Sequence, residues 1–146
     1  MEFKFLIVFH LIGACVWVGG HLILAATILP KALRLRDPAI ISGFESMFEK
    51  IGIPSLIIQV ITGIRMSMIK LPVSEWFDFS NQISALISLK IILLIMTIAL
   101  AIHARLFIIP KLDAEKIAML GWHIIGVTFI ALLMLVAGLS FRYSIL

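Results

Sequence analysis

The residues of this sequence best suited to chemistry are its four histidines, because each of them lies in a long apolar run. His10 and His21 are 11 residues apart, three helical turns with about 20° of drift, so both rings would share one helix face roughly 16 Å apart. His103 and His123 lie on either side of a connecting turn, so we expect them at similar depth. Ionisable side chains in hydrocarbon are functional candidates by default, and we interpret these histidines as ligands.

Small residues accompany the first two histidines. Gly13, Ala14, Gly19 and Gly20 leave the surface of this predicted helix almost bare, close to Trp17. Such residues alone allow close helix packing. Because they are interleaved here with histidines on one face, we expect them to clear room for a flat, bulky ligand such as a porphyrin.

The elements that hold these side chains are predicted to be membrane-spanning helices. Hydrophobic residues make up 62% of the chain and charged residues 14%, whereas a soluble domain is about half apolar and a quarter charged. Four runs reach the roughly 20 residues that a spanning helix needs, at residues 5–32, 51–69, 83–109 and 117–141. Because the connections are short, we predict an all-α, integral membrane four-helix up-down bundle, a single domain over residues 1–146. Phe44, Met47 and Phe48 recur at helical spacing among polar residues between residues 40 and 50, and they predict a short interfacial helix between the first two spans.

The two membrane faces differ in charge. We call the face that carries the N-terminus side A and the opposite face side B, so that His10 lies toward side A and the other three histidines toward side B. Basic loop residues are more numerous on side B, and the positive-inside rule therefore predicts a cytoplasmic side B, with both termini outside a bacterial inner membrane. The net charge of +4 does not indicate nucleic-acid binding, because no basic patch stands on a soluble face. The single Cys15 excludes an intrachain disulfide.

Haem b is the first ligand that suits these side chains. It is held by one or two axial imidazoles, and its propionates pair with cations near the membrane surface. We expect one haem on side B, with two of His21, His103 and His123 as axial ligands. The candidate propionate partners on that side are Arg34, Arg105 and Lys111. A second haem on side A would use His10.

Copper(I) is the second candidate ligand, because it accepts imidazole and thioether donors. Met119 and His123 are separated by one helical turn and would share a face. The alternative copper site therefore consists of His21, His103, Met119 and His123.

Two cations, Arg65 and Lys90, interrupt otherwise apolar spans on the side A half. The spans themselves contain no Asp or Glu, so we expect the anion to come from a cofactor, a quinone, a lipid phosphate, or Glu75 or Asp78 in the side A loop. The alternative is that both side chains reach the membrane surface without a specific partner.

Residues 9–24, FHLIGACVWVGGHLIL, followed by Pro30-Lys31 and a Phe-rich stretch, resemble the membrane domain of the copper-resistance protein D (CopD) family. The same arrangement of motifs resembles the HemJ-type protoporphyrinogen oxidases. The matching residues are His10 and Trp17 in the first helix, Pro54 through Gly63 in the second, and Leu89-Lys90 and His103 in the third. The fourth helix, Trp122-His123 through Gly138, looks CopD-like. The resemblance covers nearly the whole chain and rests on short apolar motifs.

Each branch of this resemblance implies its own function. CopD-like proteins are linked to copper handling across the inner membrane. HemJ-like proteins bind haem b and oxidise a porphyrinogen, and their essential residues would map to His10 and Lys90. His21 and His123 have no counterpart in the HemJ pattern, so the chain departs from it at these two positions.

Our first interpretation is a membrane haem b protein that carries out electron transfer or other redox chemistry within the bilayer. A quinone or a redox protein would be its partner, and assembly into a homo-oligomer is left open. The alternative is a copper-binding or copper-uptake protein of CopD type, and the third interpretation is a HemJ-like oxidase.

Overall fold

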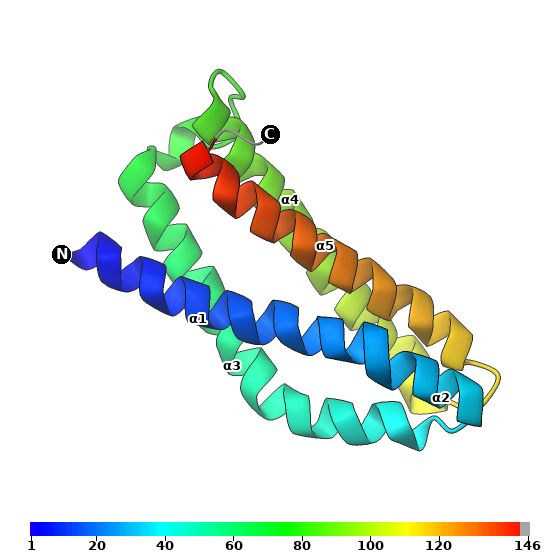
Figure 1. Cartoon of the computed structure of the whole chain (residues 1–146). Coiled ribbons are helices and arrows are strands. Elements are labelled where there is room, and N and C mark those ends of the chain that lie inside the picture. The colour runs from blue at the N-terminus through cyan, green and yellow to red at the C-terminus, as the bar shows by residue number, and fades with distance from the viewer. Residues whose placement is uncertain (144–146) are drawn as a thin grey trace.

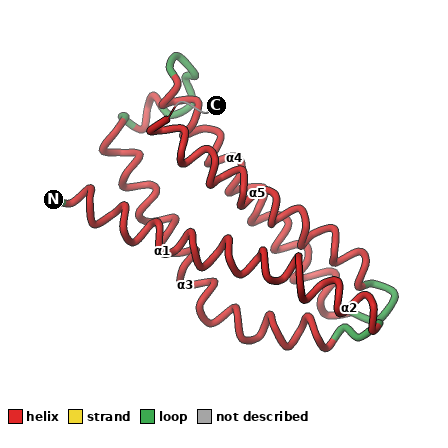
Figure 2. Tube along the Cα trace, viewed as in Figure 1, coloured by secondary structure: helices red, strands yellow, loops and turns green. Residues whose placement is uncertain are grey.

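A computed structural model describes residues 1–143, and within that range four helical segments are long and apolar enough to cross a membrane. The first combines α1 (Glu2–Ile23) and α2 (Leu29–Leu35), and the second is α3 (Ala39–Lys70). The third begins with α4 (Gln82–His103) and continues to Lys111, and the fourth is α5 (Ile117–Tyr143). No strand occurs in residues 1–143 (Figure 2). The predicted all-helical membrane bundle is confirmed.

The interfacial helix expected at residues 40–50 is not a separate element. α3 is continuous over 32 residues, and residues 40–50 form its first turns. Pro54 lies inside this helix, and its missing N–H leaves the carbonyl of Lys50 without its helical donor. The proline bends α3 instead of ending it, and Figure 1 shows α3 changing direction along its length. The part of α3 that precedes Pro54 stays helical because Phe48 packs against Trp17 of α1, with ring centroids 6.3 Å apart.

Both π-helical turns of the structure's described part come just before a proline. Leu24–Ile28 precedes Pro30, and Ala104–Ile108 precedes Pro110. A proline interrupts the regular hydrogen-bond ladder one turn earlier, and a wider turn accommodates its ring. Each of these turns follows shortly after a histidine, which places both irregularities in the side B half.

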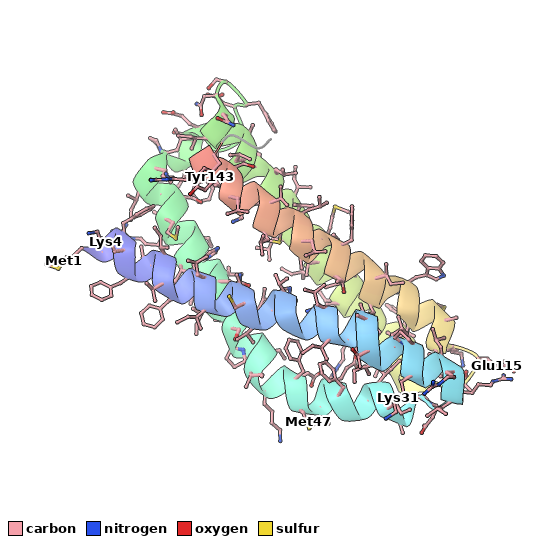
Figure 3. All side chains as sticks on the ribbon, viewed as in Figure 1. Met1, Lys4, Lys31, Met47, Glu115 and Tyr143 are labelled. Atoms are coloured by element: carbon pink, nitrogen blue, oxygen red, sulfur yellow. The ribbon has the colours of Figure 1, made fainter. Side chains whose placement is uncertain are left out.

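The four segments pack in a defined order. α1 packs mainly on α3, α4 packs on α5, and α5 also contacts α1 (Figure 1). Met1, Lys4 and Tyr143 lie at one end of the bundle, side A, and Lys31 and Glu115 lie at the other, side B (Figure 3). A buried apolar cluster gathers helices from all four segments in the side B half: Leu24, Leu29, Ala32, Ile41, Ala104, Ile108, Ile117, Leu120 and Ile124.

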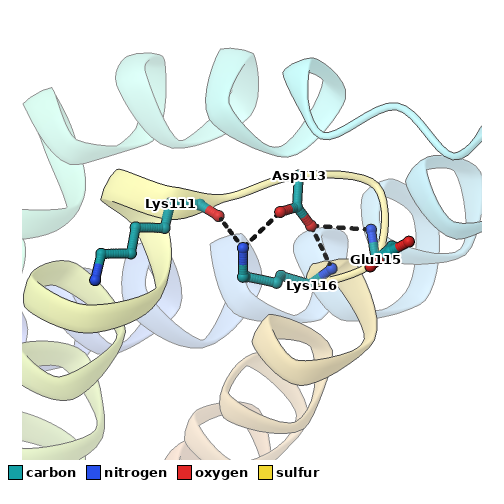
Figure 4. A network of polar contacts seen from close by, with 4 residues as sticks. All are labelled: Lys111, Asp113, Glu115 and Lys116. Atoms are coloured by element: carbon teal, nitrogen blue, oxygen red, sulfur yellow. Dashed lines mark hydrogen bonds and ion pairs between the residues drawn. The ribbon is translucent and has the colours of Figure 1, made fainter.

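The side B connection between α4 and α5 is closed by a polar network (Figure 4). The Lys116 ammonium donates to the Lys111 carbonyl at 2.9 Å and to Asp113 Oδ2 at 2.5 Å. Asp113 Oδ1 accepts the backbone N–H groups of Glu115 and Lys116 at 3.1 and 3.0 Å. The hydrogen bonds from Lys116 hold the pKa of the Asp113 carboxyl below its ordinary value.

Candidate metal-binding histidines

His103 and His123 form a direct pair across α4 and α5. His103 Nδ1 lies 2.9 Å from His123 Nε2, and the two rings are nearly parallel, with an interplanar angle of 7° and centroids 5.0 Å apart. The antiparallel packing of α4 on α5 brings them together, in agreement with the similar depth that the sequence predicts. His103 is exposed on the outside of the bundle and His123 is partly buried.

The hydrogen bonds of this pair define the proton positions. His123 Nδ1 lies 3.1 Å from the Met119 carbonyl, which can only accept, so Nδ1 carries the proton. His123 Nε2 then has a lone pair and accepts the proton of His103 Nδ1. A lone pair remains on the exposed Nε2 of His103.

The spacing of the two ring nitrogens distinguishes between ligands. A first-row metal ion binds imidazole nitrogen at about 2.0 Å, so two opposed nitrogens on one ion stand about 4 Å apart. The pair would have to open by roughly 1 Å, and the exposed His103 has room to do so. A haem between the two rings needs space for the whole porphyrin, and rings in direct hydrogen-bonded contact leave none. The pair therefore fits a small ion and does not fit a haem held between these rings.

His21 lies apart from this pair. Its Nδ1 donates to the Trp17 carbonyl at 2.8 Å, and its ring packs against Trp17 and Phe48, with centroids 4.4 and 5.7 Å apart. Its Nε2 therefore also keeps a lone pair. In the side B half, His21 is enclosed by aromatic side chains of its own helix and of α3.

The structure does not assemble the predicted copper set of His21, His103, Met119 and His123. In residues 1–143 no group of three or more His, Cys, Asp or Glu side chains could hold one metal ion. α1 and α2 pack on the face of α5 that carries Gly121 and Thr128, whereas His123 points to α4. Met119 contributes its backbone carbonyl to His123.

His10 has a similar arrangement in the side A half. Thr62 Oγ1 lies 2.6 Å from the Ile58 carbonyl, which takes the hydroxyl proton. The same oxygen lies 2.9 Å from His10 Nδ1 and must accept its N–H, which leaves the lone pair on Nε2. Thr62 was not among the predicted site residues, and its only signal in the sequence is a hydroxyl within an apolar run.

Two predicted ligand-binding cations are instead paired with acidic residues of the chain. Arg65 Nε bonds Glu2 at 2.6 Å, and Arg105 forms an ion pair with Glu49. Glu2 was not among the anions expected for Arg65, and the binding of a cofactor by Arg65 stays a prediction. Because α1 and α3 are antiparallel, the first turn of α1 brings Glu2 beside Arg65.

The small residues of α1 mostly serve packing. A Cβ on Gly13 would lie 2.7 Å from Gln59 Cγ, and one on Gly20 would lie 2.1 Å from Phe48 Cε2. The expected space for a flat ligand on the histidine face is therefore filled by α3. Among the three glycines of α1, only Gly19 has no atom within 4 Å of an added Cβ. It lines an apolar groove of about 390 Å³ between α1 and α3, and none of the four histidines lines this groove.

Comparison with known proteins gives one match. The family model described as copper resistance protein D matches residues 43–141, which run from α3 through α5 and include His103 and His123. No curated protein and no solved structure matches the chain. The predicted resemblance to this family is confirmed, and the relation to HemJ-type oxidases stays a prediction.

Proposed function

The chain belongs to the copper resistance protein D family, and we propose on that premise that it binds copper(I) within the membrane as cargo, at the His103–His123 pair. The observation that carries this proposal is the direct contact of two imidazoles from neighbouring spanning helices. Imidazole is a suitable copper ligand, and the family name links these membrane proteins to copper resistance.

The tautomers of the pair support a small-ion site. The Met119 carbonyl holds the proton of His123 on Nδ1, so that Nε2 faces His103 with its lone pair. His103 needs only to move its proton from Nδ1 to its exposed Nε2 to present a second lone pair. Two neutral nitrogens then face one ion, and no net proton is released. Hydrogen bonds that fix ligand tautomers in this way raise metal affinity.

The electrostatic surroundings also suit a singly charged ion. Arg105 is two residues from His103, and its charge is compensated by Glu49. An ion with one positive charge loses less hydration energy in an apolar site than a divalent ion. Copper(I) therefore fits better than a divalent metal.

The haem interpretation has weaker support than copper. The best-placed imidazoles are in contact with each other, and the predicted propionate partner Arg105 is occupied by Glu49. The space expected along the His10–His21 face is filled by Gln59 and Phe48. We therefore propose the copper function ahead of haem electron transfer.

A copper(I) titration of the purified protein in detergent, against a coloured competing chelator, tests this proposal. We expect one copper(I) per chain, and His103→Ala and His123→Ala should each lower the affinity by more than the 10–100-fold typical of second-shell changes. His21→Ala is the matched control, because it removes a histidine of the same half that does not contact the pair. Unchanged affinity in both pair variants would refute the site, and a Soret band in the purified protein would restore the haem interpretation.

A further inference from the structure

The groove between α1 and the first half of α3 opens on the outer surface of the bundle. It has a volume of about 390 Å³ and is lined almost entirely by apolar side chains, among them Cys15, Gly19, Ile23, Phe44, Phe48 and Ile51. Cys15, Ile23 and Ile51 are exposed, so one side of the groove faces the hydrocarbon that surrounds a membrane bundle. In a bilayer the occupant of this groove must therefore be apolar and narrow.

Two cations continue the groove-lining face of α1 toward side B. Lys31 follows Ile23 by eight residues, which make about two turns because five of them form the wider π-turn Leu24–Ile28. Lys31 therefore lies on the face of Ile23, and Arg34 follows it by three residues on the same side of the helix. Both side chains are exposed, and Lys31 marks the side B end of the bundle (Figure 3). Neither forms an ion pair within residues 1–143.

The spacing of the groove and the cations matches one lipid molecule. Cys15 and Ile23 are about 12 Å apart along the helix axis, and Lys31 lies about 12 Å beyond Ile23. One leaflet measures roughly 20–22 Å from the midplane of the bilayer to the outer edge of its headgroups. A lipid whose phosphate lies at Lys31 therefore has an acyl chain alongside the groove. The neighbouring Arg36 and Asp37 add one charge of each sign, so this end stays positive and favours an anionic headgroup.

We propose that the groove, Lys31 and Arg34 form a binding site for an anionic phospholipid of the side B leaflet. One acyl chain lies between α1 and α3, and the phosphate pairs with the two cations. A phosphate suits this pair, because a guanidinium can donate two parallel hydrogen bonds to it and an ammonium adds a point charge. A free phosphate ion would use the same cations but would gain nothing from the groove. The site is separate from the His103–His123 pair and does not depend on the copper function.

Native mass spectrometry of the full chain in detergent, titrated with phosphatidylglycerol or phosphatidylcholine, tests the role of the cations. We expect the wild type to prefer phosphatidylglycerol, and inorganic phosphate should not displace it. A cation near an anionic lipid surface contributes roughly fivefold, so Lys31→Gln with Arg34→Gln should lower the affinity for phosphatidylglycerol roughly 25-fold. Lys4→Gln with Arg142→Gln is the matched control, because it removes two exposed cations at side A and should leave this affinity unchanged.

Gly19→Leu tests the role of the groove. A Cβ at Gly19 meets no atom within 4 Å, so the larger side chain fills the groove without moving a helix, whereas a single methyl group leaves room for a fluid acyl chain. We expect Gly19→Leu to lose phosphatidylglycerol binding. Gly43→Leu is the matched control and should bind as the wild type does, because Gly43 also has open space at its Cβ but does not line the groove.

Cys15, the only cysteine of the chain, lines the groove and gives a direct readout of its occupancy. Phosphatidylglycerol should slow the alkylation of Cys15 by a lipid-soluble maleimide more than phosphatidylcholine does. The proposal is overturned if phosphatidylglycerol gives Cys15 no such protection, or if the side A variant loses as much affinity as the side B variant. It is also overturned if Gly19→Leu binds as the wild type does, because the cations would then attract headgroups without a site for the acyl chain.

Discussion

The close approach of α1 and α3 makes a sharp prediction for Gly13→Ala. The new Cβ would lie 2.7 Å from Gln59 Cγ and 2.9 Å from the Ser55 carbonyl oxygen, where ordinary contacts between carbon atoms are about 3.5–4.0 Å. Gln59 is a flexible side chain and can turn away. The Ser55 oxygen belongs to the backbone, so α3 itself must shift by several tenths of an ångström.

Gly19→Ala is the matched control on the same helix. A Cβ at Gly19 would meet no atom within 4 Å. Both substitutions gain the same helix propensity, about 1 kcal/mol, so this gain cancels when the two are compared. The remaining difference is the overpacking that the new methyl group causes at residue 13. We expect it to make Gly13→Ala less stable than Gly19→Ala by about 1–3 kcal/mol.

Reversible unfolding in mixed micelles, followed by loss of helicity against the mole fraction of denaturing detergent, measures this difference. Wild type and both variants should be compared under one set of conditions. A difference below about 0.5 kcal/mol, the range of ordinary surface substitutions, would show that α1 and α3 do not pack as described. If Gly19→Ala destabilised the protein more than Gly13→Ala, the groove between α1 and α3 beside Gly19 would have to be occupied.

Two further predictions concern the side B connection and the membrane orientation. The folded-state pKa of Asp113 lies below its ordinary value of 3.8, so its bonds to Glu115 and Lys116 contribute fully above that pH and are lost as the pH falls through the lowered pKa. The amide chemical shifts of Glu115 and Lys116 should titrate with a midpoint below 3.8 and stop responding in Asp113→Asn, whereas a midpoint above 3.8 would contradict the network. The excess of basic residues in side B loops predicts external termini, so alkaline phosphatase fused to the C-terminus should be active and a fluorescent protein fused there should be dark. The opposite pattern would reverse the orientation.

The elements and the depth of the site were predictable from the sequence, because both depend on position along the chain. Spans follow from the length of apolar runs, and the matched depth of His103 and His123 follows from counting residues on either side of their turn. Pro54 shows a feature that counting residues does not predict. Pro54 was expected near the start of a span and instead lies inside a continuous α3, because packing of Phe48 on α1 keeps the preceding turns helical.

The tertiary structure alone decides which helix faces meet. The pattern of small residues is the same whether it receives a ligand or a neighbouring helix, and the position of α3 fills it with Gln59 and Phe48. Arg65 finds Glu2 only because α1 and α3 are antiparallel neighbours. His21 lies in the same half of the membrane as the His103–His123 pair, yet it does not contact them. The depth of a side chain follows from its position along its own helix. Contact between two side chains also depends on how both helices are rotated about their axes, which the sequence does not specify.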